Sequence, residues 1–194
     1  MSDPVEVLDY WIGAVGEAGW YAGGEELDAE IRAMFGDLWE AARDGGLEHW
    51  VEGPAPTLAY LVLTDQMPRN MHRGKAEAFA TDARALAAAR KAIAEGWDML
   101  APEPERQFFY MPFEHSEDPI DQAQSVALMG QRLSDPEMLL HARAHQEIIR
   151  KFGRFPYRNA ALGRESTAEE REFIEKGGYG AMVQSLKASH AGGA

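Results

Sequence analysis

The sequence predicts an all-α protein built from stacked antiparallel helical hairpins. Three observations lead to this fold class. Apolar residues recur at the three- and four-residue spacing of helices along most of the chain. Short breaks that contain proline or glycine separate these segments. No run shows a convincing alternation of apolar and polar residues, which is the pattern of a half-buried strand.

The first half of the chain contains helices with clear start and stop signals. Asp3 and Pro4 form an N-cap followed by proline at the first helical position. A second helix is expected at about 25–43, before a Gly-Gly pair. A third, at about 57–66, should stop at Met67-Pro68 because proline disfavours helical geometry in the residue before it. A long alanine-rich helix is expected next, at about 75–95.

The second half continues the same rhythm. Two helices are expected at about 120–133 and 136–152. Ser166 or Thr167 should cap a last helix, and Glu169 or Glu170 completes the pattern of a capping box. We therefore expect one domain over residues 1–187, followed by a disordered tail, ASHAGGA, over 188–194.

Composition limits the classes of function. The chain of 194 residues has a formal net charge of −13, which argues against binding to nucleic acid or to an anionic membrane. It has no cysteine, which excludes disulfides, thiolate zinc sites and cysteine nucleophiles and fits a cytoplasmic protein. The N-terminus resembles no signal peptide, and the longest apolar run, LAYLVL, is too short to span a membrane.

Polar residues gather in three loops: TDQMPRNMHRG, PFEHSEDPIDQ, and KFGRFPYRN with the GRES that follows it. The segment from Lys151 to Arg164 carries four basic residues and no acid, although the whole chain is acidic. If the three loops lie on one side of the hairpin stack, cations of the first and third would meet the acids and imidazole of the second. Spacing along the chain does not decide whether they do.

The leading hypothesis is a pocket for a small phosphorylated or carboxylated metabolite, because guanidinium groups bind such anions with two hydrogen bonds. His115 is the first candidate acid or base, with Glu114 and Asp65 nearby. The ligand-binding candidates are Arg69, Asn70, Arg73, Arg154, Arg158, Asn159, Arg164 and His145. The sequence leaves open whether the protein is an enzyme.

Structural alternatives exist for each of these groups. The arginines could tie loops together by pairing with Glu114, Glu117, Asp118 and Asp121. In HSED, Ser116 could cap the next helix, with Glu117 and Asp118 favoured near its positive end.

His141 and His145 lie four residues apart, a spacing that can hold a metal, but HARAH lacks the glutamate of the HExxH zinc motif. The alternative is that His145 is partly buried and bonded to a loop carbonyl, with His141 near the surface. We predict no metal and no cofactor, since no phosphate-binding loop or dinucleotide motif is present.

The three loop motifs, with the opening VLDYWIG…WY, closely resemble the bacterial domain-of-unknown-function family number 924. The resemblance runs in the same order from about Val5 to Tyr179, and the long FGRFPxRNxxLGRxST pattern is specific. It implies an all-helical, TPR-like fold but no reaction. The family typically has FPHRN where this chain has Tyr157, so a proposal that needs an imidazole there does not apply.

A second hypothesis follows from the TPR-like fold that the resemblance implies. The protein could be an adaptor that binds a peptide in a groove, with the motif arginines serving the structure alone. The oligomeric state is left open.

Overall fold

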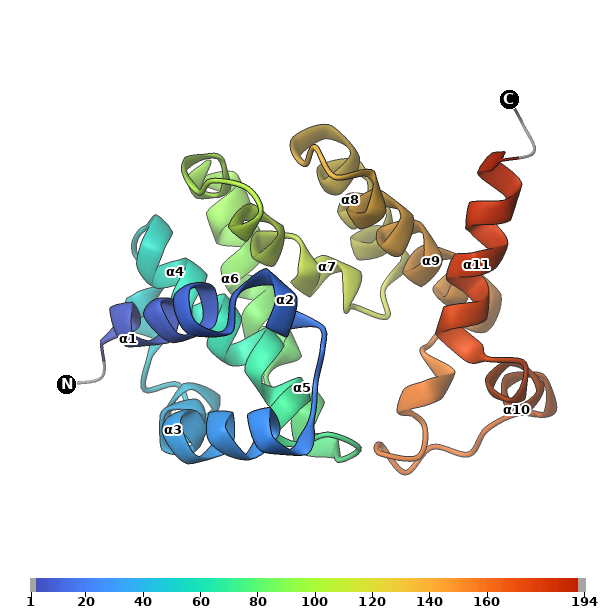
Figure 1. Ribbon diagram of the computed structural model, residues 1–194, viewed down its shortest axis with the longest axis horizontal. Coiled ribbons are helices and arrows are strands. Elements are labelled where there is room, and N and C mark those ends of the chain that lie inside the picture. The colour runs from blue at the N-terminus through green and yellow to red at the C-terminus, as the bar shows by residue number, and fades with distance from the viewer. Residues whose placement is uncertain (1–2, 192–194) are drawn as a thin grey trace. The chain divides into compact units, whose positions relative to one another are not determined.

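A computed structural model describes residues 3–191 (Figure 1). Every regular element in this range is a helix and none is a strand, which confirms the all-α prediction. The TPR-like stacking of the hairpins stays a prediction. The chain divides into two compact units between Pro112 and Phe113, and the prediction of one domain over 1–187 stays a prediction. The division falls inside the segment MPFEH, where a proline follows Met111.

The first unit begins with helices that bury aromatic residues. The elements are α1 (Pro4–Leu8), a π-helical segment (Asp9–Val15), α2 (Gly16–Trp20) and α3 (Glu25–Arg43). Asp3 caps α1 as predicted, because its carboxylate accepts the Val5 N–H at 2.9 Å. α3 buries Ile31, Phe35 and Trp39, which follow one another every fourth residue and so share one face.

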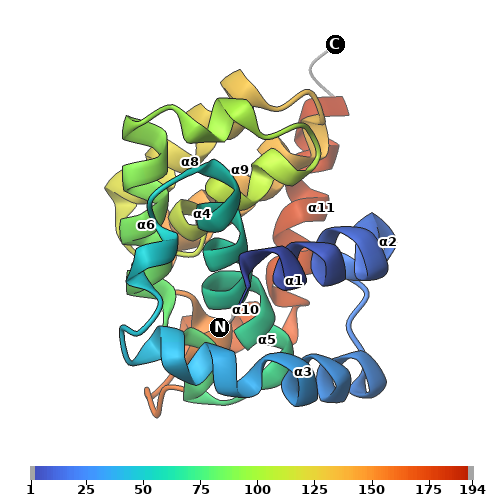
Figure 2. The same cartoon turned by 90° about the vertical axis from the view of Figure 1, so that its left-hand side faces the viewer.

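The chain does not leave the helical conformation at Met67-Pro68, so the predicted stop is wrong. α4 (Pro54–Leu61) continues through a π-helical segment (Val62–Gln66) into α5 (Met67–Met71). Pro68 lies in the first turn of α5, where its missing N–H is not needed. Figure 2 shows α1 beside α4 and α3 beside α5, and residues of these pairs are in contact.

The predicted helix over 75–95 is broken in two. A 3₁₀ turn (Ala76–Phe79) precedes α6 (Asp82–Ala94). Between them lies Thr81, which is fully buried: its hydroxyl donates to the Thr64 carbonyl at 2.6 Å and accepts from Trp39 Nε1 at 3.2 Å. Further 3₁₀ turns of this unit are Glu48–Trp50, Trp97–Leu100 and Glu105–Phe109.

The second unit contains the later sequence motifs. Its elements are the end of α7 (Met111–Glu114), α8 (Pro119–Arg132), α9 (Pro136–Phe152), a 3₁₀ turn (Pro156–Arg158), α10 (Ala168–Glu175) and α11 (Gly178–Ala191). α9 packs against both α8 and α11. A core of Ile148, Ile149 and Phe155 lies at the end of α9, with Phe173, Tyr179 and Met182 packed against it.

Side-chain caps start the helices of this unit. Thr167 and Glu170 form the predicted capping box of α10. The cap of α8 is Asp118, which accepts the Ile120 N–H at 2.7 Å, so the expectation that Ser116 caps this helix is wrong. Ser116 instead accepts the Asp118 N–H at 3.1 Å and donates to Asp121 at 2.7 Å.

The predicted disordered tail begins inside a helix. α11 runs to Ala191, so residues 188–191 are helical, and residues 192–194 lie outside the described residues. α11 is joined to α9 by a pair between Lys187 Nζ and Glu137 Oε2 at 2.6 Å. Over residues 3–191, no helix has both the length and the apolar character needed to cross a membrane.

Candidate functional site

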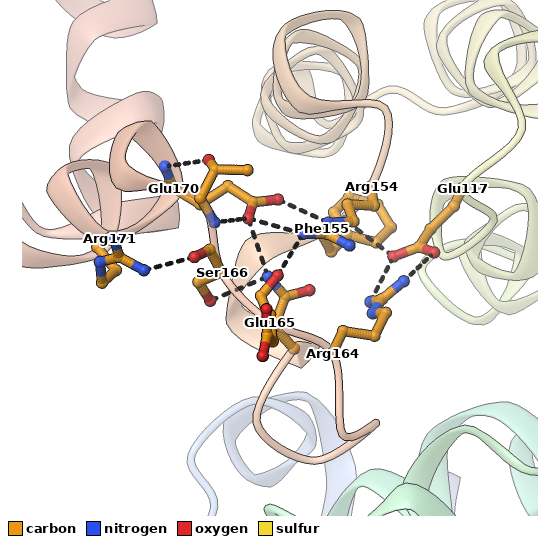
Figure 3. A network of polar contacts seen from close by, with 10 residues as sticks. Glu117, Arg154, Phe155, Arg164, Glu165, Ser166, Glu170 and Arg171 are labelled. Carbon is orange, nitrogen blue, oxygen red and sulfur yellow. Dashed lines mark hydrogen bonds and ion pairs between the residues drawn. The ribbon is translucent and has the colours of Figure 1, made fainter.

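The basic motif of the second unit folds around the buried carboxylate of Glu170 (Figure 3). Gly153 ends α9 with φ = 70°, and this left-handed conformation turns the chain back toward α10. Arg154 then reaches Glu170 with Nε at 2.6 Å and Nη2 at 2.8 Å, a two-bond contact. Arg154 also donates to the carbonyl of Glu165 at 2.8 Å.

Glu170 collects further donors because it also serves the capping box. It accepts the Thr167 N–H at 2.7 Å and Asn159 Nδ2 at 3.2 Å, and the residue is only 2% exposed. The hydrogen bond from Arg154 is the main reason that the pKa of Glu170 falls to about 2; burial opposes the shift, and the Thr167 and Asn159 donors add to it. Glu170 is therefore ionised at neutral pH.

The second and third loops meet at Glu117. Its carboxylate accepts Arg164 Nη1 at 2.8 Å and Nη2 at 3.0 Å, and also the Phe155 N–H at 2.8 Å (Figure 3). Burial alone would raise the pKa of Glu117, but the Arg164 and Phe155 donors outweigh it and hold that pKa below its usual value. The pairing between arginine and the acidic loop, expected as the structural alternative, is present here for Glu117.

Arg158 is held by an aromatic ring. The residue is 6% exposed, and its guanidinium carbon lies 4.6 Å from the centre of the Phe155 ring. Tyr157 stacks on the same ring at 5.3 Å and remains 41% exposed.

A second buried carboxylate, Glu114, lies among histidines. Glu114 is 3% exposed, and its Oε1 is 2.6 Å from His145 Nδ1. Burial alone would raise the pKa of Glu114, but the charge and hydrogen bond of His145, with the charges of His115 and His141, outweigh it and lower that pKa. The carboxylate is therefore kept ionised beside imidazole.

The surroundings of His145 are aromatic. The centre of its ring lies 4.7 Å from that of Tyr179, 5.4 Å from that of Phe155 and 6.1 Å from that of His115. His145 Nδ1 is also 3.0 Å from the backbone oxygen of His141, whose own Nδ1 is hydrogen-bonded to the Tyr179 hydroxyl. We call Glu114, His115, His141, His145 and Tyr179 the histidine cluster.

The residues predicted from the first loop lie in the other unit. Asn70 Nδ2 donates to Asp28 Oδ1 at 2.8 Å, and Arg73 donates to the same carboxylate at 2.8 Å and 3.0 Å. Burial alone would raise the pKa of Asp28, but these donors outweigh it and lower that pKa. Arg69 Nη1 lies 3.4 Å from Asp65 and 3.1 Å from Asp82.

The candidate residues predicted from the sequence thus include several donors but only some of their acceptors. Asp28 and Glu170 were not among the candidate residues, and Glu170 was recognised only as part of a capping box. Tyr179 was not among the candidates, and the sequence offered His141 either as a metal ligand or as a residue near the surface. The roles of Arg69, Arg73, Arg154 and Arg164 in ligand binding stay a prediction, and each of the four guanidinium groups already pairs with a carboxylate.

Neither a metal centre nor a described pocket coincides with these residues. Within residues 3–191, no group of three or more histidine, aspartate or glutamate side chains could hold a metal ion. A surface pocket of about 290 Å³ lies in the first unit between Tyr60, Arg84 and Lys91, and one of about 310 Å³ lies in the second unit between Lys151, Phe173 and Lys176. None of the predicted site residues lines either of them.

Comparisons with known proteins identify relatives of the same fold. A solved structure of a protein of unknown function, ATU0120 from Agrobacterium tumefaciens, is 40% identical, with a TM-score of 0.85. That match covers 90% of this chain and 97% of the other. No curated protein matches the chain. The model of a family described as bacterial proteins of unknown function, DUF924, matches residues 7–178, and the chain therefore belongs to the DUF924 family.

Proposed function

We propose that the second unit binds a small anionic metabolite, phosphorylated or carboxylated, at His145 and uses that imidazole as a general base. One observation carries the proposal: His145 Nδ1 lies within hydrogen-bonding distance of two acceptors, the Glu114 carboxylate and the His141 carbonyl. An imidazole nitrogen between two acceptors must carry a hydrogen. In the neutral ring, the lone pair is therefore at Nε2.

This arrangement suits proton abstraction. Glu114 orients the ring and would stabilise the imidazolium that forms when Nε2 takes a proton, which is the role of a carboxylate behind a catalytic histidine. Nε2 of His145 has no hydrogen bond to any residue in the described part of the chain. His115 is the first candidate for acid or base from the sequence, but the better-oriented imidazole is that of His145.

The ligand is expected to be negatively charged because a cation lies on the same aromatic ring that His145 contacts. The cation is Arg158, which is mostly buried, and the ring is that of Phe155. A ligand anion would be attracted to this cation. In this proposal Arg154 and Arg164 hold the loop in place and do not contact the ligand.

Thermal unfolding in the presence of small anions tests the proposal. The probes are inorganic phosphate, a sugar phosphate and short carboxylates, added to wild type, His145→Gln and His49→Gln. His49 is an exposed histidine of the first unit and serves as the matched control. We expect a probe to raise the Tm of wild type and of His49→Gln by mass action, and this rise to disappear in His145→Gln.

Two results would contradict the proposal. A rise in Tm that survives in His145→Gln would place the anion elsewhere, and a wild-type protein that responds to none of the probes would argue against an anion site.

A further inference from the structure

We infer that His141 and His145 form an acid–base pair held in opposite tautomers, with Tyr179 as the group that positions His141. The inference rests on the proposed function for His145 and adds a proton donor to its base. The two histidines lie four residues apart on α9, so they share one face of the helix. Both rings contact the same Tyr179 ring, at 5.9 Å and 4.7 Å between centres.

The two Nδ1 atoms have opposite kinds of partner. His145 Nδ1 faces a carboxylate and a carbonyl, which only accept, so this nitrogen carries the hydrogen. His141 Nδ1 faces the hydroxyl of Tyr179, which can donate. A phenol is a much stronger acid than the N–H of neutral imidazole, so this bond is strongest when Tyr179 donates. Neutral His141 then carries its hydrogen on Nε2.

The backbone before Tyr179 fixes this contact. Gly177 and Gly178 have φ values of 101° and 54°, in the region that residues with a side chain rarely adopt. They place Tyr179 in the first turn of α11, where its ring stacks on that of His141 with 22° between the planes. The hydroxyl therefore approaches His141 from a defined direction.

Opposite tautomers give the two histidines complementary tasks. His145 presents a lone pair at Nε2 and His141 presents an N–H there, and neither atom is hydrogen-bonded within the described chain. A ligand can lose a proton to His145 while another of its atoms gains the Nε2 proton of His141. As that proton leaves, the hydroxyl proton of Tyr179 moves to His141 Nδ1. The ligand keeps its number of protons, and the charges remain as imidazolium beside Glu114 and as tyrosinate.

The chemistry defines a class of ligand. The group that fits carries both a donor and an acceptor, such as a hydroxyl beside a carboxylate or phosphate. The class of reaction moves a proton from one atom of this ligand to another, or adds or removes water.

Nitrogen NMR of the histidine rings tests the tautomers directly. The full chain is labelled with ¹⁵N-histidine, and ring nitrogens are correlated with ring protons at a pH where both rings are neutral. Assignments come from His141→Gln and His145→Gln. We expect the hydrogen on Nδ1 of His145 and on Nε2 of His141, each with a preference of about tenfold, which corresponds to one hydrogen bond of about 1.4 kcal/mol.

Removing the Tyr179 hydroxyl should affect the tautomer of one histidine and not that of the other. In Tyr179→Phe, His141 should lose its tautomer preference while His145 keeps its own. Tyr157→Phe, which changes an exposed tyrosine of the same unit, should alter neither. The inference is overturned if wild-type His141 carries its hydrogen on Nδ1, or if Tyr179→Phe leaves the preference of His141 unchanged.

The ligand-free spectra do not depend on the anion screen. If the two histidines are in opposite tautomers but the protein binds no anion, the proposed function is contradicted. The tautomers of the inference would then stand, but its proton transfer to and from an anionic ligand would not. If the protein binds an anion through His145 but both histidines carry the hydrogen on the same ring nitrogen, only this inference is contradicted.

Discussion

The same arrangement of side chains occurs once in each unit. In the first, Asn70 and Arg73 bind the carboxylate of Asp28; in the second, Asn159 and Arg154 bind that of Glu170. In both, the arginine just before the asparagine lies over a phenylalanine: Arg69 over Phe79 at 5.9 Å and Arg158 over Phe155 at 4.6 Å. We call these the Asp28 cluster (Asp28, Asn70 and Arg73) and the Glu170 cluster (Glu170, Asn159 and Arg154).

The two clusters differ in how far solvent can replace the protein donors. The side chain of Arg73 is 58% exposed, whereas that of Arg154 is 28% exposed. Glu170 also accepts the backbone N–H of Thr167 and completes a capping box, which Asp28 does not. Exposed ion pairs add little stability, and a partly buried pair that also caps a helix adds more. In both units a carboxylate therefore binds the asparagine and an arginine of a loop, and we expect the exposure of that arginine to set how much the contact stabilises the fold.

Removal of the Glu170 charge should have the largest effect. Glu170→Gln keeps the shape but places an amide NH2 where one carboxylate oxygen accepts from Arg154, so Arg154 loses an acceptor and the negative charge it pairs with. We expect the Tm to fall by roughly 5 °C or more. Glu169→Gln, an exposed acid in the same helical turn, is the control and should change the Tm by no more than about 3 °C. Equal effects of the two changes would contradict a special role for Glu170.

Acid should remove the same contribution. The pKa of Glu170 is about 2 in the folded chain against an ordinary value of 4.5, so this carboxylate stabilises the fold above pH 4.5. The contribution is lost as the pH falls from 4.5 toward about 2. The Tm difference between wild type and Glu170→Gln, measured from pH 7 down to pH 2.5, should therefore shrink. A difference that stays constant over this range would show that ionisation of Glu170 is not its cause.

The matched change in the first unit should have a smaller effect. Asp28→Asn removes the partner of an exposed arginine, whose lost hydrogen bonds water can replace. We expect a fall in Tm of about 2–4 °C, measured beside Asp37→Asn, a change at an exposed position of the same helix that should have almost no effect. A fall larger than that of Glu170→Gln would reverse the comparison and show that exposure does not rank the two clusters.

Local signals predicted much of the fold. The Asp3 cap, the Thr167–Glu170 capping box and the apolar face of α3 depend on residues within a few positions of one another. The errors also have local causes. Pro68 predicts a stop because the sequence does not show that a π-helical segment places it in a first turn, where proline is tolerated.

The candidate site was less predictable because its partners are far apart in sequence. Asn70 and Arg73 bond to a residue 42 and 45 positions away, and Arg164 to one 47 positions away. His141 and His145 were visible as a pair on one helix face, but the tyrosine that contacts both rings is on another helix. No periodicity encodes such contacts.

The sequence by itself therefore determined the helical class, most helix starts and membership of the DUF924 family, because these depend on local spacing and on a specific motif. Only the tertiary structure decided which acid meets which arginine and which acceptors lie beside Nδ1 of His145. The physical reason is that pairing and tautomer depend on which donors and acceptors are brought together when distant helices pack. Spacing along the chain does not contain that information.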